Sequence, residues 1–128
     1  KRVILIDDSI VRGTTSKKIV QMIRDAGAAE VSMLVASPPT ISPCYYGIDT
    51  PDKKDLMAAN FNLQEMKEMI GVDHLAYISI NGLYKAVANC RRDDGSPQYC
   101  DACFTNDYPI RIADIQGDET PLLNVNND

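Results

Sequence analysis

The sequence has little positive charge, a single histidine, and no long apolar run among its 128 residues. Its 13 lysines and arginines against 18 acidic residues give a net charge of -5, which disfavours nucleic acid as a partner because no basic stripe is available for a phosphate backbone. No apolar run approaches the roughly 20 residues of a membrane span, and the start does not resemble a signal peptide. We therefore expect a cytoplasmic protein without membrane contact. His74 has no cluster of polar partners around it in the sequence, so no site is assigned to it.

The four cysteines, in an acidic and apparently intracellular chain, favour metal ligands, catalytic groups or buried thiols over disulfides. The length and the 45% hydrophobic content suit one domain with a core. The chain opens on Lys1 and Arg2 and passes at once into a strand pattern without an initiator methionine. We therefore expect a fragment of a longer chain.

The first 36 residues predict a strand, a helix and a second strand. Residues 3–6 and 31–36 are short apolar runs of the kind found in buried strands. The segment between them predicts an amphipathic helix of about three turns, capped by Thr14 or Thr15 and stopped by Gly27. The apolar face of this helix consists of Ile19, Val20, Ile23 and Ala26. A βαβ unit of this length implies parallel strands, so the predicted fold class is α/β.

Beyond residue 40 the pattern becomes helical and rich in loops. The predicted segments are an ordered loop at 40–51, helices at 53–59 and 63–70, a strand at 75–80 that leads into a short helix, and a polar linker at 91–98. Either Ser79 or Asn81 is expected to begin the short helix. Residues 1–110 are assigned to the folded part, and residues 111–128, which are polar, acidic and rich in asparagine, to a flexible tail.

The segment 7–15 follows the first strand and precedes the helix, which is the usual place for an anionic ligand in an open α/β sheet. Backbone N–H groups at the helix start can point at a phosphate, and Gly13 lets the backbone come close. Ser9, Thr14 and Thr15 add hydroxyl donors. A loop of this composition can hold a phosphate without a lysine.

Two adjacent carboxylates, Asp7 and Asp8, stand at the end of the first strand. They would repel each other unless something neutralised them, which indicates a divalent cation or a polyhydroxy ligand. Magnesium fits best, because it commonly binds through one or two carboxylates together with ligand phosphates. If the strand pleat continues, the two side chains point to opposite faces and have different roles. The alternative is an ordinary polar turn that caps a helix.

Residues 3–15 read V-I-L-I-D-D-S-I-V-R-G-T-T and closely resemble the phosphoribosyl pyrophosphate (PRPP) signature of type I phosphoribosyltransferases. The resemblance implies that the two acids lie by the ribose hydroxyls of PRPP and its magnesium ion, while residues 9–15 surround the 5-phosphate. Arg12 then acts through its backbone alone. The implied PRPP-binding residues are Asp7, Asp8, Ser9, Ile10, Val11, Arg12, Gly13, Thr14 and Thr15, with magnesium at Asp7 and Asp8.

The cysteine spacing indicates a metal centre. In the Cys100-x-x-Cys103 motif two thiolates can bind one centre from a tight turn, and Cys44, from a distant loop, adds a third ligand. Zinc and an iron-sulfur cluster are both compatible with this spacing, and a redox pair is a weaker third choice. Unligated thiols are the alternative without a metal.

Residues 43–50, 75–83 and 99–105 resemble, in the right order, the glutamine PRPP amidotransferase family. The resemblance implies that the chain is the C-terminal part of a type I phosphoribosyltransferase domain, in the branch that carries a 4Fe-4S cluster. Cys44, Cys100 and Cys103 match three cluster ligands, and the fourth lies outside this sequence. Cys90 falls in the polar linker and is expected to be an ordinary free thiol. The glutaminase domain and its catalytic cysteine are also missing, so no catalytic residue is assigned and the fragment alone is expected to be inactive.

The resemblance implies the first committed step of purine biosynthesis, in which PRPP, glutamine and water give 5-phosphoribosylamine, glutamate and pyrophosphate. Purine nucleotides are then expected as feedback inhibitors, and the complete enzyme is expected to be a homo-oligomer. Two alternatives come from other classes: a regulatory module that senses PRPP on the same fold, and a zinc-stabilised fragment without activity. The cysteine segments argue against the regulatory module.

Overall fold

The structure is a computed structural model that describes residues 1–110 and 112. The flexible tail predicted at 111–128 therefore lies, apart from residue 112, outside the described residues. In the described part of the chain, no helix has both the length and the apolar character needed to cross a membrane.

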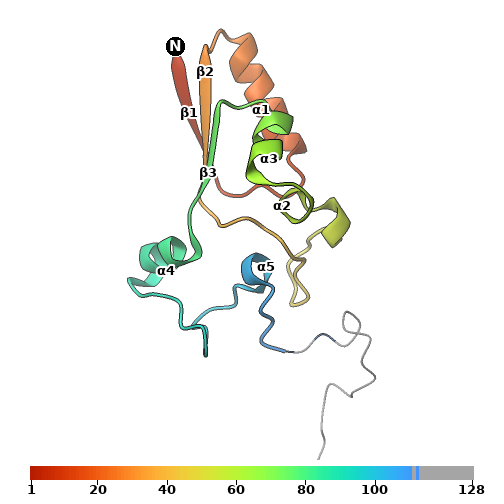
Figure 1. Ribbon diagram of the computed structural model, residues 1–128, viewed down its shortest axis with the longest axis vertical. Coiled ribbons are helices and arrows are strands. Elements are labelled where there is room, and N and C mark those ends of the chain that lie inside the picture. The colour runs from red at the N-terminus through yellow and green to blue at the C-terminus, as the bar shows by residue number, and fades with distance from the viewer. Residues whose placement is uncertain (111, 113–128) are drawn as a thin grey trace, which may run out of the picture.

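A three-stranded parallel sheet organises the first 77 residues (Figure 1). Its strands, in spatial order, are β1 (Arg2–Asp7), β2 (Glu30–Val35) and β3 (His74–Tyr77). The register pairs Asp7 with Val35 and Val35 with Tyr77, so the three strands end together at one edge. The predicted α/β class and the parallel βαβ unit are confirmed.

The helices follow the sequence pattern with local differences. They are α1 (Thr14–Asp25), the 3-10 helix η1 (Lys53–Asp55), α2 (Met57–Asn60), α3 (Leu63–Ile70), α4 (Ile80–Ala88) and α5 (Ala102–Thr105). The single helix predicted at 53–59 is wrong, because Leu56 adopts an extended backbone and separates η1 from α2. The strand predicted at 75–80 spans His74–Tyr77 instead. Ser79, one of the two predicted starts of α4, caps that helix by accepting a hydrogen bond from the Gly82 N–H at 3.0 Å.

The core lies on the face of the sheet that α1 and α3 cover (Figure 1). Alternate residues of β2 point into it, which is the period-2 pattern of a strand buried on one face. The buried residues of the sheet and of these helices are Val31, Met33, Val35, Leu75, Val20, Met66 and Ile70. On the opposite face Ile4 and Ile6 are 67% and 70% exposed, and Leu34 is 43% exposed.

An ion pair joins the end of α1 to the start of β3. The Arg24 guanidinium donates to Asp73 Oδ2 at 2.6 Å, and the same oxygen accepts the Val31 N–H of β2 at 2.7 Å. The hydrogen bonds from Val31 and Arg24 hold the pKa of the Asp73 carboxyl below its ordinary value. Ionised Asp73 therefore connects α1, β2 and the start of β3, and its protonation removes the ion pair with Arg24.

We expect Asp73→Asn to lower the midpoint of thermal unfolding at neutral pH, because it removes the charge that Arg24 contacts. Since the folded-state pKa is lowered, the contribution of Asp73 is complete above its unfolded pKa and is lost as the pH falls through the folded value. Thermal unfolding followed between pH 2 and pH 7 measures both effects. The control is Asp52→Asn, which removes an exposed pair with Lys54 and should leave the midpoint unchanged. Equal shifts in the two variants would contradict the prediction.

Candidate functional site

The loop between β1 and α1 surrounds an open hollow of about 330 Å³, which we call the phosphate hollow. Its lining residues are Asp7, Asp8, Ser9, Val11, Arg12, Gly13, Thr14, Thr15 and Ser16. Eight of the nine predicted PRPP-binding residues are thus brought together, and Ser16 is added by the first turn of α1. The exception is Ile10, which is 1% exposed and points into the core, so its side chain anchors the loop.

Gly13 determines how the loop enters the helix. Its φ of 77° is left-handed, and it occupies the N-cap position without any side chain to cap the helix. The predicted cap at Thr14 or Thr15 is therefore wrong, because both threonines already lie inside α1. The amides of the first helical turn have no acceptor within the helix, and a glycine cap leaves them available to an anion.

Contacts with Met57 of α2 hold the loop between β1 and α1 in place. The Met57 N–H donates to the Val11 carbonyl at 2.8 Å, and the Met57 side chain packs where a Cβ atom on Gly13 would stand. The left-handed backbone disfavours a side chain at this position, and a Cβ atom would also require the flexible end of Met57 to move.

The two carboxylates face the hollow without a basic partner. Neither Asp7 nor Asp8 makes an ion pair with any described residue. Asp7 Oδ1 accepts the Asp8 N–H at 3.0 Å, and Asp8 Oδ1 accepts the Ser9 hydroxyl at 3.2 Å. The remaining oxygens are the hard ligands that magnesium takes together with phosphate oxygens, so the donor set fits that ion.

The loop between β1 and α1, which we call the phosphate loop, also borders a second hollow of about 370 Å³. We call this second space the cysteine hollow. Cys44, Cys100 and Cys103 all line it, together with Ser9 and Val11 of the phosphate loop. The other lining residues are Ser37, Thr40, Tyr46, Ile48, Thr50, Ala102, Phe104 and Tyr108. Cys90 is not among them. Cys44, Cys100 and Cys103 therefore share one hollow, and the phosphate loop forms part of its lining. Their role as metal ligands stays a prediction.

Backbone and side-chain hydrogen bonds hold the two cysteine segments together. The Cys103 carbonyl accepts the Ile41 N–H at 2.9 Å and the Ser42 N–H at 3.1 Å. The Tyr108 hydroxyl donates to the Pro43 carbonyl at 2.6 Å. Cys44 and α5 therefore keep their relative position through bonds that do not involve the thiols.

The thiol of Cys103 is harder to ionise than an ordinary cysteine. All four cysteines are free thiols. Burial raises the pKa of the Cys103 thiol, and the neighbouring Cys44 and Cys100 raise it further. Without a metal ion the protonated form of Cys103 is therefore favoured, and a soft metal ion that bound this thiol would displace its proton. Among the described residues, no three Cys, His, Asp or Glu side chains lie close enough together to coordinate a metal ion.

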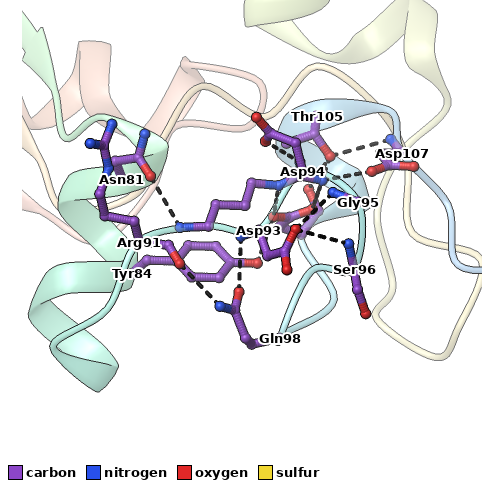
Figure 2. Close-up of polar contacts among 12 residues, drawn as sticks. Asn81, Tyr84, Arg91, Asp93, Asp94, Gly95, Ser96, Gln98, Thr105 and Asp107 are labelled. Atoms are coloured by element: carbon purple, nitrogen blue, oxygen red, sulfur yellow. Dashed lines mark hydrogen bonds and ion pairs between the residues drawn. The ribbon is translucent and has the colours of Figure 1, made fainter.

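Sequence analysis missed an ionic cluster next to the Cys100-x-x-Cys103 turn, in which Arg92 and Asp101 are shielded from solvent while Asp94 and Asp107 are exposed. Its centre is Arg92, whose side chain is 9% exposed and contacts Asp94, Asp101 and Asp107. Figure 2 shows Asp94, Thr105 and Asp107 on one side of the cluster and Asn81 and Tyr84 of α4 on the other. We call Arg92 with the side chains that hydrogen-bond to it or to Asp101 the Arg92 cluster. The sequence of a polar linker does not reveal such a cluster, because residues that contact each other in it are up to 17 positions apart.

Burial works against ionisation of Asp101, yet the hydrogen bonds from Arg92 and Tyr84 outweigh it and hold the pKa of this carboxyl below its ordinary value. The same bond to Asp101, with those to Asp107 and Asp94, raises the pKa of Arg92. Both groups are therefore charged.

The sequence also did not indicate a role for Ser37, which lines the cysteine hollow. Its Oγ atom is buried without a hydrogen-bond partner among the described residues.

Gly13→Ala is expected to destabilise the protein and to weaken anion binding in the phosphate hollow. The left-handed backbone costs an alanine about 1–2 kcal/mol, and the collision with Met57 adds to that. Gly27→Ala is the matched control, because Gly27 is also left-handed, at φ 92°, but its Cβ atom would meet no atom within 4 Å. Urea unfolding should show the larger loss of free energy for Gly13→Ala. Equal losses would show that Met57 gives way without cost.

Comparison with known proteins finds homologues over most of the chain. No family model matches. The chain is 56% identical over 119 residues to the amidophosphoribosyltransferase of Rhizobium etli and 53% identical over 112 residues to that of Archaeoglobus fulgidus. These matches cover 92% and 88% of the chain but 24% of each relative. The chain thus spans about a quarter of the length of the relatives it matches.

A solved structure gives the same result for the fold. The glutamine PRPP amidotransferase of Bacillus subtilis, complexed with ADP and GMP, matches with a TM-score of 0.76 and 47% identity over 84% of this chain and 24% of its own. A second structure, described as the allosteric regulatory enzyme of purine biosynthesis, matches with a TM-score of 0.76 and 48% identity over 85% of this chain and 23% of its own. The predicted phosphoribosyltransferase-type fold and the resemblance to amidotransferases of this kind are confirmed.

Proposed function

We propose that this chain is the PRPP-binding part of an amidophosphoribosyltransferase, the enzyme that makes 5-phosphoribosylamine in the first committed step of purine biosynthesis. The observation that carries the proposal is the phosphate hollow, where eight of the nine signature residues surround one space at the carboxyl edge of a parallel sheet. The supporting comparisons are homologues that are amidophosphoribosyltransferases at 53–56% identity.

In this proposal the 5-phosphate of PRPP lies against the first turn of α1. The amides of Thr14, Thr15 and Ser16 and the nearby hydroxyls supply donors to the phosphate oxygens, while the glycine cap keeps the approach open. Asp7 and Asp8 take the ribose hydroxyls and a magnesium ion. The ion supplies positive charge to the pyrophosphate that leaves.

The reaction replaces pyrophosphate at the anomeric carbon with ammonia. The carbon–oxygen bond to pyrophosphate breaks, the bond to nitrogen forms, and the ribose carries positive charge in between. The carboxylates of Asp7 and Asp8 stabilise that charge, and the loop fixes the ribose through its 5-phosphate. Ammonia comes from glutamine, which a glutaminase domain outside this sequence hydrolyses to glutamate.

The cysteine hollow is proposed to hold a 4Fe-4S cluster through Cys44, Cys100 and Cys103, with a fourth ligand outside this sequence. The three cysteines line one hollow, which supports a centre with thiolate ligands there. The cluster has a structural or oxygen-sensing role, because it links the loop around Cys44 to the segment around α5. Zinc in the same place is the competing assignment.

Regulation by purine nucleotides and assembly as a homo-oligomer are part of the same proposal. The Bacillus subtilis relative is complexed with ADP and GMP. A module that only senses PRPP is the alternative, and the identity with enzymes extends beyond the phosphate loop to most of the chain, which favours the enzyme.

A calorimetric titration of the full-length protein with PRPP, with and without magnesium, tests the site. We expect magnesium-dependent heat with PRPP and a weaker signal with ribose 5-phosphate, which lacks the pyrophosphate. Asp8→Asn should weaken PRPP binding roughly 10- to 100-fold, the effect of losing a hydrogen bond to a charged group. Asp25→Asn, at the far end of α1, is the matched control. Unchanged binding in Asp8→Asn would overturn the assignment of the carboxylates.

The cysteine assignment predicts a contrast between two serine variants. Cys44→Ser should lose iron and inorganic sulfide from protein purified without oxygen, because Cys44 lines the cysteine hollow. Cys90→Ser should retain both, since Cys90 lies outside that hollow. Metal and sulfide analysis measures the difference. Zinc without sulfide in the unmodified protein would favour the competing assignment.

A further inference from the structure

The Arg92 guanidinium uses most of its hydrogen-bonding capacity inside the protein. Its Nε and Nη2 atoms donate to the two oxygens of Asp101 at 2.7 and 3.2 Å, which is the bidentate geometry of an arginine–carboxylate pair. Nη1 donates to Asp94 at 2.8 Å, and Nη2 also donates to Asp107 at 2.7 Å. One cation therefore connects the linker before the Cys100-x-x-Cys103 turn, the turn itself and the segment after α5.

Asp101 is the residue through which this cluster reaches the cysteines. It lies directly after Cys100 and two residues before Cys103, and it is 4% exposed. Besides Arg92 it contacts the Tyr84 hydroxyl at 2.8 Å and the Thr105 hydroxyl at 3.0 Å. Its two carboxylate oxygens thus accept four hydrogen bonds, so its side chain has little freedom to rotate.

The same residue begins α5. The Asp101 carbonyl accepts the N–H groups of Phe104 and Thr105 at 2.9 and 3.1 Å. Tyr84 and Asn81 of α4 meet the cluster from the other side, where the Asn81 side chain accepts the Arg92 N–H at 3.1 Å. Figure 2 shows these two α4 residues approaching from the helix while Thr105 and Asp107 approach from the α5 segment. Both ends of the cysteine turn are therefore fixed by one network.

Stability alone is a weak reason for such a network. Taking an arginine and a carboxylate out of water costs energy that their attraction often only balances, and apolar side chains of similar volume commonly serve the fold as well. A buried pair of charges does, however, set one geometry, because any other arrangement leaves an uncompensated charge. Here the geometry so determined is the position of two thiols that line the same hollow as Cys44.

We propose that Arg92 is a positioning residue for the metal ligands Cys100 and Cys103. By holding Asp101 at both oxygens, Arg92 limits the conformations of the intervening turn and so keeps both cysteines in the lining of the hollow that Cys44 shares. The inference rests on the proposed metal centre in the cysteine hollow. The linker at 91–98 contributes no metal ligand of its own, but its Arg92 keeps the two ligands in position.

Cobalt(II), added without oxygen to metal-free full-length protein, is the probe. Its thiolate-to-cobalt charge-transfer absorbance reports how many thiolates bind, and competition with a chelator gives the affinity. We expect Arg92→Lys, which keeps the charge but loses the bidentate fork, to weaken cobalt binding about 10- to 100-fold and to lower the absorbance per bound ion. Arg91→Lys is the matched control, because Arg91 makes no side-chain hydrogen bond or ion pair with the described residues.

Tyr84→Phe and Thr105→Val each remove one hydrogen bond to Asp101 and leave Arg92 in place. They should give smaller losses in the same direction, and they keep the test decisive if Arg92→Lys fails to fold. Circular dichroism and the PRPP titration should be unchanged in every variant that folds. The cobalt spectrum then separates the two roles, because a residue that only stabilises the fold would change stability without changing that spectrum.

Three outcomes separate this inference from the proposal on which it rests. Weaker cobalt binding and altered absorbance in the Arg92 variant would support it. Wild-type affinity and spectrum in all three variants would overturn the role of Arg92 while leaving the metal centre intact. Absence of thiolate-bound cobalt in the unmodified protein would overturn both the metal centre and the positioning role, and PRPP binding would still be judged by its own titration.

Discussion

The parallel register of three strands is the constraint on which the rest of the structure depends. Because Asp7, Val35 and Tyr77 are paired in register, β1, β2 and β3 end at the same edge. The phosphate loop leaves the first strand there, the loop that carries Cys44 leaves the second, and α4 follows the third. Two backbone bonds extend this edge, from Ala36 to the Asp7 carbonyl and from Ile78 to the Val35 carbonyl.

That edge explains why two kinds of chemistry lie next to each other. Oxygen-bearing side chains and helix amides gather in the phosphate hollow, and three cysteines line the cysteine hollow. Ser9 and Val11 line both. Asp7 and Asp8 line the phosphate hollow but not the cysteine hollow, and the side chain of Ile10 anchors the loop between the two hollows in the core.

Local sequence made the phosphate hollow predictable, since the nine signature residues are contiguous and eight of them line it. Spacing and resemblance also placed Cys44, Cys100 and Cys103 together, and these residues line one hollow, while their role as ligands stays a prediction. The Arg92 cluster could not be predicted, because it depends on which charges are buried, and a linker with two arginines and two aspartates looks the same in sequence whether it is buried or solvated. The predicted cap of α1 was wrong because hydroxyl residues usually cap helices, whereas here Gly13, with its left-handed backbone, occupies the N-cap position.

The wall shared by the two hollows has an evolutionary consequence. An insertion of one residue in the phosphate loop would shift Val11, which faces the cysteine hollow and also accepts a hydrogen bond from Met57. An insertion in the loop around Cys44 would move the opposite wall against Ser9. A change of length in either loop therefore alters the lining of the hollow that the other loop helps to form, and grafting one loop alone onto another scaffold would transfer only part of that lining.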